Sequence, residues 1–121
     1  MGYLFKKDKK YILDSSSNLM LYDNSIPTEN LPNIFGDGAE NNFIKFFNYL
    51  KNSKFPYFDI ENYYYFKIDR WDVQFSNKKT IKFPSKKVEE AIKKSIKLLN
   101  RDDFEKYKVI DLRVDGKIVV E

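Results

Sequence analysis

The sequence predicts an α+β domain in which a mainly antiparallel, twisted sheet of about seven strands carries two helices on one face and closes with a C-terminal hairpin. Two observations lead to this prediction. Several short segments alternate apolar and polar residues, as half-buried strands do, and two longer segments repeat apolar residues at helical spacing. Turn-forming residues separate these segments, but no linker or internal repeat divides the chain, so we expect residues 1–121 to form a single domain.

Composition narrows the possible functions. The 121 residues are 42% hydrophobic and 33% charged, which suits one domain with a single core. Cysteine and histidine are absent, which removes disulfides, thiol catalysis and the usual zinc and general-base side chains, so no metal or cofactor is expected. The net charge of +4 favours anionic partners only weakly, because just three of the 22 basic residues are arginine. The sequence has no apolar run of 18 residues, so we expect no membrane-spanning segment.

The first third of the chain predicts two strands around a polar turn. Residues 11–13 and 19–22 are the apolar flanks, and the segment between them is rich in aspartate, serine and asparagine. The lysine-rich residues 6–10 are expected to be a solvated tip. Residues 23–33 contain two prolines and are expected to form a loop.

A glycine pair leads into the first predicted helix. The Gly-Asp-Gly-Ala stretch at residues 36–39 lacks the Lys-Ser/Thr of a phosphate loop, so we expect a tight helix entry with Asp37 near the N-cap. Pro56 ends the helix. Its apolar face, which we assign to the core, consists of Ala39, Phe43, Phe46, Phe47 and Leu50.

The middle of the chain predicts a meander of three strands. Period-two alternation puts Tyr63 and Tyr65 on one face of the first strand and four apolar residues on the other: Ile60, Tyr64, Phe66 and Ile68. The phase then changes before Trp71, which we attribute to a turn or bulge at Asp69-Arg70. Trp71 is expected in the core, because indole rings bury large areas. Residues 80–83 are the third strand.

The second predicted helix follows Pro84. Ser85 is a candidate N-cap, and acidic residues lie early in the segment and lysines late, as the helix dipole favours. Its predicted apolar stripe consists of Val88, Ile92, Ile96 and Leu99, with Ala91 and Ser95 beside them.

The C-terminal stretch predicts a hairpin with the Asp-Gly turn at residues 115–116. A two-residue loop would put Val114 opposite Lys117 and Leu112 opposite Val119. The last strand would then be apolar on both faces, with Ile118 and Val120 on the face of Asp111 and Arg113. Two outcomes are open: an exposed edge that invites pairing with another chain, or a helix or loop that covers the second face.

Several stretches resemble the C-terminal β-domain of the bacterial cell-division family FtsQ, also called DivIB. The most specific is Val-Ile-Asp-Leu-Arg at residues 109–113, before a short turn and a final strand. The others are Arg-Trp-Asp-Val at 70–73 with its hairpin to Phe83-Pro84, Val-Glu-Glu-Ala at 88–91, Leu-Pro at 31–32 with Gly-Asp-Gly-Ala at 36–39, and Ile-Leu-Asp at 12–14. Their order matches almost end to end, and the Arg-Trp-Asp and Gly-x-Gly-Ala pieces are most similar to the alphaproteobacterial branch.

The resemblance implies a non-enzymatic scaffold on the periplasmic face of the inner membrane. Relatives carry a membrane helix and a POTRA domain before this β-domain, so we expect the chain to be a soluble fragment whose Met1-Gly2 is a cloning start. They hold FtsB- and FtsL-type division proteins, with a partner segment added beside the last strands. The resemblance places partner-binding residues at Arg70, Arg113, Val114, Ile118, Val119 and Val120.

Individual residues match or depart from the family pattern at the expected partner-binding surface. Arg113 matches a family arginine that faces an acidic residue of FtsB, although it is equally placed to pair with Asp111 or Asp72. Asp69 replaces the first of two arginines common in the family, which weakens the expected positive patch. Val114 replaces a residue that is aromatic in some relatives.

Two other functions compete. A nucleic-acid or anionic-polymer binder would use lysines with Tyr63 and Tyr65 as stacking platforms, but no RNP-like motif is present. An enzyme would use carboxylates such as Glu89-Glu90 or the cluster of Asp102, Asp103 and Glu105. No nucleophile–base pair accompanies them, so we interpret these residues as solvated charges.

Overall fold

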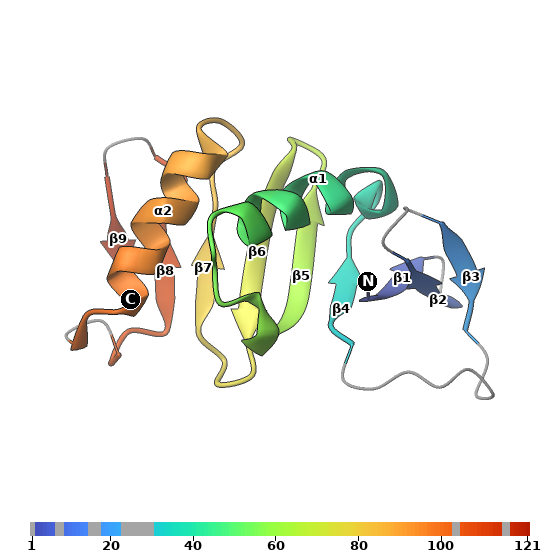
Figure 1. The fold of residues 1–121 in the computed structure, drawn as a ribbon, viewed down its shortest axis with the longest axis horizontal. Helices are drawn as coiled ribbons and strands as arrows, with labels where there is room; N and C mark the ends of the chain where they lie inside the picture. Colours follow the sequence, from blue (N-terminus) through green and yellow to red (C-terminus); the bar gives the residue numbers. More distant parts are fainter. Residues whose placement is uncertain (1, 7–8, 15–17, 23–30, 103–104, 115–116) are drawn as a thin grey trace.

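The computed structural model of the protein describes residues 2–6, 9–14, 18–22, 31–102, 105–114 and 117–121. In these residues nine strands form one sheet, and two helices lie across one of its faces (Figure 1). The helices are α1 (Ala39–Asn52) and α2 (Val88–Leu99), and a short 3-10 turn, η1, covers Tyr57–Asp59. The strands are β1 (Gly2–Lys6), β2 (Lys9–Leu13), β3 (Leu19–Leu21), β4 (Asn33–Phe35), β5 (Ile60–Phe66), β6 (Arg70–Phe75), β7 (Thr80–Lys82), β8 (Val109–Asp111) and β9 (Val119–Val120).

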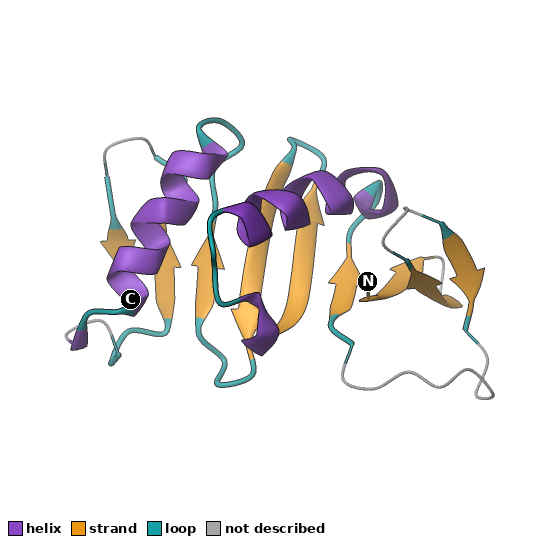
Figure 2. Cartoon of the chain, viewed as in Figure 1, coloured by secondary structure: helices purple, strands orange, loops and turns teal. Residues whose placement is uncertain are grey.

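The sheet is mixed, in the order β3-β2-β1-β4-β5-β6-β7-β8-β9. The α+β class and the two helices are as predicted, but the sheet has more strands than expected and three of its pairs are parallel: β1 with β4, β4 with β5, and β7 with β8. Two of these pairs follow from the helices. α1 connects β4 to β5 and α2 connects β7 to β8, and a helical crossover returns the chain parallel to the strand it left. Figure 2 shows both helices crossing over the same face.

β1 is a strand that the prediction missed. It lies between β2 and β4, with Leu4 in the core, although residues 6–10 were expected to be only a solvated tip. Gly2 pairs with Leu13 and approaches β4 closely: a Cβ there would lie 2.7 Å from Cδ1 of Ile34. A side chain at this position would require the neighbouring strand to shift.

The predicted phase of β5 is wrong. The register with β6 shifts between Ile60 and Asn62, so one inserted residue reverses the faces of all that follow. Tyr63 is fully buried and meets the ring of Phe43 edge-to-face at 4.9 Å, whereas Ile68 is exposed in the turn before β6. Tyr63 and Tyr65 therefore point toward the helices.

The apolar faces of both helices and the tight glycine entry into α1 are close to the prediction, but the predicted N-cap of α2 is wrong. Gly38, with φ 87°, is the N-cap of α1, and Asp37 directly precedes it, near the cap as expected. Lys87, with φ 56°, is the N-cap of α2, and Ser85 lies outside the helix without capping it. The buried residues of α1 are Ala39, Glu40, Phe43, Phe46 and Leu50, and those of α2 are Ala91, Ile92, Ser95 and Leu98.

The core between helices and sheet is dominated by rings. Trp71 is buried, as predicted, and its indole stacks on Phe46 at 5.3 Å between centroids. Phe46 in turn meets Phe83, and Phe83 meets Phe55. This cluster fixes β6 and β7 beneath α1, and β8 and β9 continue the sheet beyond them under α2 (Figure 1).

Candidate functional site

β9 ends the sheet, as the sequence analysis suggested for the last strand. It pairs with β8, and on its other side the described part of the chain contributes no strand. Val119 and Ile118 are 39% and 41% exposed. The site is therefore a short, uncharged edge at one end of the sheet.

The predicted register of the hairpin is wrong by one residue. Val119 lies opposite Asp111, not Leu112, and Val120 lies opposite Ile110. A one-residue shift exchanges the two faces, so Val120 packs against the core and Val119 shares the open face with Asp111.

The connection between the strands explains the shift. β8 ends at Asp111, so more residues separate the two strands than a two-residue loop requires. The Lys117 N–H does donate to the Val114 carbonyl at 3.1 Å, which joins the two residues that were expected to flank the turn. The predicted Asp-Gly pair, residues 115–116, lies outside the described residues.

In the described part of the chain, β9 has main-chain hydrogen-bonding groups on its outer side with no strand beside them. The Glu121 N–H donates to the Val109 carbonyl at 3.0 Å, and the Val109 N–H donates back at 3.3 Å. Because these groups alternate along a strand, Val119 faces β8 like Glu121, whereas the N–H and C=O of Val120 and Ile118 point away from the sheet.

Arg113 lies beside this edge and pairs with Asp111, one of the two partners expected from sequence. Its Nε lies 2.9 Å from Oδ1 of Asp111 and its Nη2 lies 2.6 Å from Oδ2. The hydrogen bonds from Arg113 hold the pKa of the Asp111 carboxyl below its usual value. The Arg113 side chain remains 45% exposed, so it has surface left for a further contact.

Arg70 lies apart from this edge, on β6. Its guanidinium pairs with Asp72 at 2.5 Å and lies over the Phe66 ring, 4.3 Å from the centroid. The side chain is 10% exposed. Arg70 therefore lies two strands from β8 and is engaged by Asp72, although Asp72 and Arg113 are close enough to influence each other's pKa.

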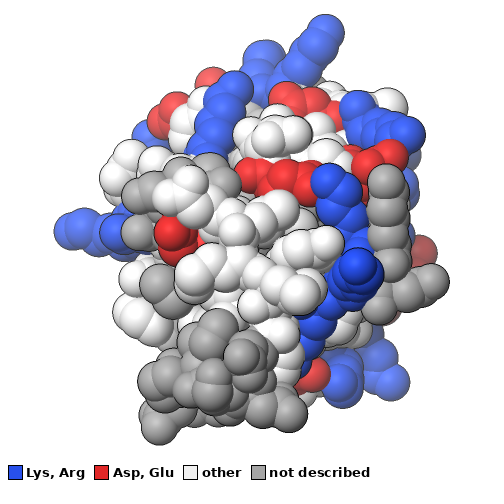
Figure 3. All heavy atoms as spheres, turned by 90° about the vertical axis from the view of Figure 1, so that its right-hand side faces the viewer, with Lys and Arg blue, Asp and Glu red and all other residues white. Residues whose placement is uncertain are grey.

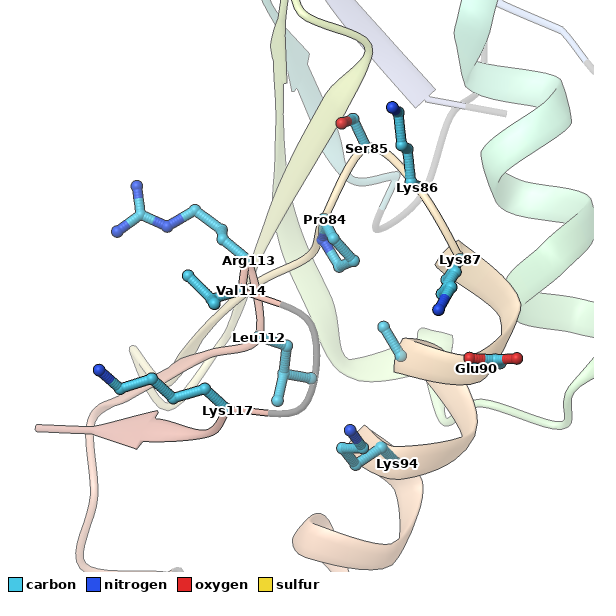
Figure 4. A pocket seen from close by; sticks show the side chains of 11 residues that line it. Pro84, Ser85, Lys86, Lys87, Glu90, Lys94, Leu112, Arg113, Val114 and Lys117 are labelled. Carbon is cyan, nitrogen blue, oxygen red and sulfur yellow. The ribbon is translucent and has the colours of Figure 1, made fainter.

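A cation-lined hollow of about 280 Å³ lies between the start of α2 and the segment after β8 (Figure 4). Arg113 and Val114, both predicted partner-binding residues, line it. The other charged residues that line it had no predicted role in binding: Lys86, Lys87, Glu90, Lys94 and Lys117. The hollow has five basic side chains and one acidic one, and Leu112, Ala91 and Pro84 supply apolar walls. Lys86, Lys87 and Lys94 come from a segment far from Arg113 in sequence, so no local motif indicated that they line the same hollow.

The competing functions find less support in the described residues. Tyr63 is buried in the core, which raises the pKa of its hydroxyl and leaves no ring face for a base to stack on. Tyr65 is partly buried, and its ring packs on Trp71 at 4.9 Å. Among the residues described, no group of three or more carboxylates is placed to hold a metal ion.

The fold and the site together define a class of protein: a small α+β domain whose sheet ends in an uncharged edge strand beside a hollow lined by basic side chains. A family model described as cell division protein FtsQ/DivIB, C-terminal, matches residues 2–113. The chain therefore belongs to the FtsQ/DivIB family, which confirms the resemblance seen in its motifs, and it has a role in cell division.

The match carries information about the family, and other observations accompany it. The family is a non-enzymatic scaffold family that is periplasmic and membrane-anchored. In the described part of this chain, neither helix has the length and apolar character needed to cross a membrane. The match ends at Arg113, so β9 lies beyond it. A comparison with curated proteins found no match.

Proposed function

We propose that this chain is the partner-holding domain of a division scaffold on the periplasmic face of the inner membrane, and that it catalyses no reaction. It binds FtsB- and FtsL-type division proteins by accepting one extended partner segment beside β9. The observation that supports this proposal is the outward main chain of Val120 and Ile118 on an edge strand without charge. Such an edge is a template for another strand.

The side chains around the edge supply selectivity. Val119 and Ile118 offer apolar contact on the outside of the strand. Arg113 and the lysines of the hollow lie near Lys117, just before the start of β9, where one end of an added partner segment would come (Figure 4). An acidic residue of the partner would gain a charge-assisted hydrogen bond there.

The main-chain pattern allows a sharp test by proline substitution. Ile118→Pro removes an outward N–H, so we expect it to abolish binding of an FtsB-type periplasmic segment with little loss of stability. Val119→Pro removes an N–H that faces β8, so we expect it to lower the melting temperature. Calorimetric titration and thermal melting measure the two effects.

Val119→Pro is the matched control, because it is the same change one residue away. If Ile118→Pro binds the segment as tightly as the unchanged protein, no strand is added at this edge. If both variants bind normally while folded, the partner surface lies elsewhere on the domain.

A further inference from the structure

We propose that β9 pairs with the β9 strand of a second copy of this chain, in an antiparallel register centred on Val119, and that this self-pair covers the edge until a partner segment displaces it. The self-pair itself needs no division partner; only its displacement rests on the function proposed above. β9 lies at one end of the sheet, and among the described residues no strand lies on its outer side (Figure 1). A symmetric second copy would continue the sheet there.

The outward main-chain groups allow this register. Val119 and Glu121 turn their N–H and C=O groups toward β8, as the bonds between Glu121 and Val109 show, so those of Ile118 and Val120 point outward. Two residues of an antiparallel pair exchange both hydrogen bonds when the groups of each point toward the other. Centring the pair on Val119 puts Ile118 opposite the second copy's Val120, and Val120 opposite its Ile118. The outward groups of both residues are then bonded.

The charges at the two ends of the strand select this register among the alternatives. Lys117 and Glu121 are exposed and lie two residues before and two residues after Val119, so each faces the other across the self-pair. Opposite charges directly across a strand pair stabilise it. A register centred on Ile118 would put Lys117 opposite a valine, and one centred on Val120 would put Glu121 opposite a valine.

The side chains between these charges also suit the self-pair. Val119 would lie across from its own copy on the open face of the sheet, and Ile118 across from Val120 on the face that carries the helices. β-branched residues pack well across neighbouring strands. Val119 and Ile118 are 39% and 41% exposed, so pairing removes apolar surface from water.

The other end of the sheet has no equivalent arrangement in its described strand. β3 is Leu-Met-Leu, so a self-pair of these three residues would bring no charge opposite another. Figure 3, which views that end, shows Lys and Arg as well as Asp and Glu side chains around uncharged residues. The residues of β3 therefore select no register, whereas Lys117 and Glu121 select one at β9.

The self-pair is small, which makes it reversible. A pair of such short strands is smaller than the interfaces of stable complexes, which bury roughly 1,200 Å² or more. Copies therefore exchange readily, and a partner segment with further contacts can displace one of them. The family is membrane-anchored, and anchoring raises the local concentration of copies.

The absence of cysteine from the sequence allows the register to be tested by disulfide formation. Val119→Cys would place two thiols across the centre of the self-pair, where Cα atoms lie about 4.5 Å apart, within the range that a disulfide spans. We expect this variant, in a glutathione buffer, to form at least about tenfold more disulfide dimer than Ile118→Cys. Ile118→Cys is the matched control, because the two residues are almost equally exposed but two copies of residue 118 lie diagonally, about 7–8 Å apart.

Exchange of the two charges tests their role. In the Val119→Cys protein, Lys117→Glu should lower the yield of disulfide dimer about tenfold, because it replaces opposite charges by like charges at both ends of the pair. Glu121→Lys should do the same. Both substitutions together should restore the yield, because each end again has opposite charges. The melting temperature of each variant shows that it is folded.

Three results would overturn the proposal: equal dimer yields from Val119→Cys and Ile118→Cys, no loss of yield on a single charge reversal, and no recovery when both charges are exchanged. Titration with an FtsB-type segment distinguishes this proposal from the function proposed above. Disulfide dimer in a protein that does not bind the segment would support the self-pair and refute the partner. A segment that binds a protein without selective dimer formation would do the reverse.

Discussion

The open face of the sheet carries the same ion pair twice, in two different environments. Arg70 with Asp72 on β6, and Arg113 with Asp111 just after β8, are each separated by one residue, so both side chains of a pair lie on one face. In the first pair both side chains are 10% exposed, whereas in the second the arginine is 45% exposed.

This difference in burial reverses the sign of the pKa shift. Burial raises the pKa of the Asp72 carboxyl above its usual value, although the Arg70 guanidinium opposes this. Hydrogen bonds from Arg113 lower the pKa of the Asp111 carboxyl, because water still solvates that pair. The comparison teaches that the same two residue types serve the fold in one place and leave a charge available at the surface in the other.

The largest effect should come from breaking the buried pair. Arg70→Ala leaves the Asp72 carboxylate without its partner in a largely dry site and removes the cation that covers Phe66. We expect unfolding free energy to fall by about 3–5 kcal/mol. Urea denaturation measures this loss.

Arg113→Ala is the matched control, and it should cost about 1 kcal/mol or less, because the pair is solvated. Equal losses in the two variants would show that burial does not separate the pairs.

A smaller effect concerns partner binding. Arg113→Glu should weaken binding of an FtsB-type segment by about 2 kcal/mol, the low end for a charge pair, because Asp111 already engages the arginine. The melting temperature should change little. Titration with the segment tests this, and Arg70→Lys serves as a comparison that conserves charge away from the edge. Unchanged affinity in a folded Arg113→Glu protein would remove Arg113 from the interface.

The smallest effect is a pair of opposite pH dependences. Asp111 has a lowered pKa in the folded state, so its stabilising contribution is present above about pH 3.8 and is lost as pH falls through the lowered value. Asp72 has a raised pKa, so its contribution is present below about pH 3.8 and is lost as pH rises through the raised value.

Melting curves recorded against pH for Asp72→Asn and Asp111→Asn measure these contributions by difference from the unchanged protein. The two differences should change with pH in opposite directions. Parallel curves would mean that neighbouring charges, and not burial, set both pKa values.

Patterns that extend over many residues predicted this fold best. The helix faces hold because each repeats over several turns, and the β2–β3 hairpin because its polar turn is flanked by apolar runs. The prediction was wrong where a single residue changed the register. One inserted residue before Asn62 places Tyr63 on the buried face, and a shift of one residue in the pairing of β9 with β8 places Val120 on the buried face. Because side chains along a strand alternate between two faces, a register error of one residue places every following side chain on the wrong face of the sheet.

The part of the candidate site made by residues close in sequence could be predicted. The part made by segments far apart in sequence could not. The motif around Arg113 and the apolar last strand identified the β9 edge. The burial of Arg70 depends on Phe66 across the turn and on Asp72, and the hollow depends on α2 approaching the end of β8. Neither follows from local sequence, because both need the packed sheet.

The attachment of β9 has a mechanical consequence. β8 is bonded to β7 and linked to it through α2. In the described part of the chain, β9 has main-chain bonds, such as those between Val109 and Glu121, to β8 and to no other strand. A tension transmitted by a strand lying on β9 passes through these few bonds in series. If the partner strand is pulled along the strand direction, all these hydrogen bonds bear the force together. If it is pulled perpendicular to the strands, the bonds break one after another. If a partner segment pairs with β9 as proposed above, the direction of pull would set how long the link lasts, independently of how tightly the partner binds at rest.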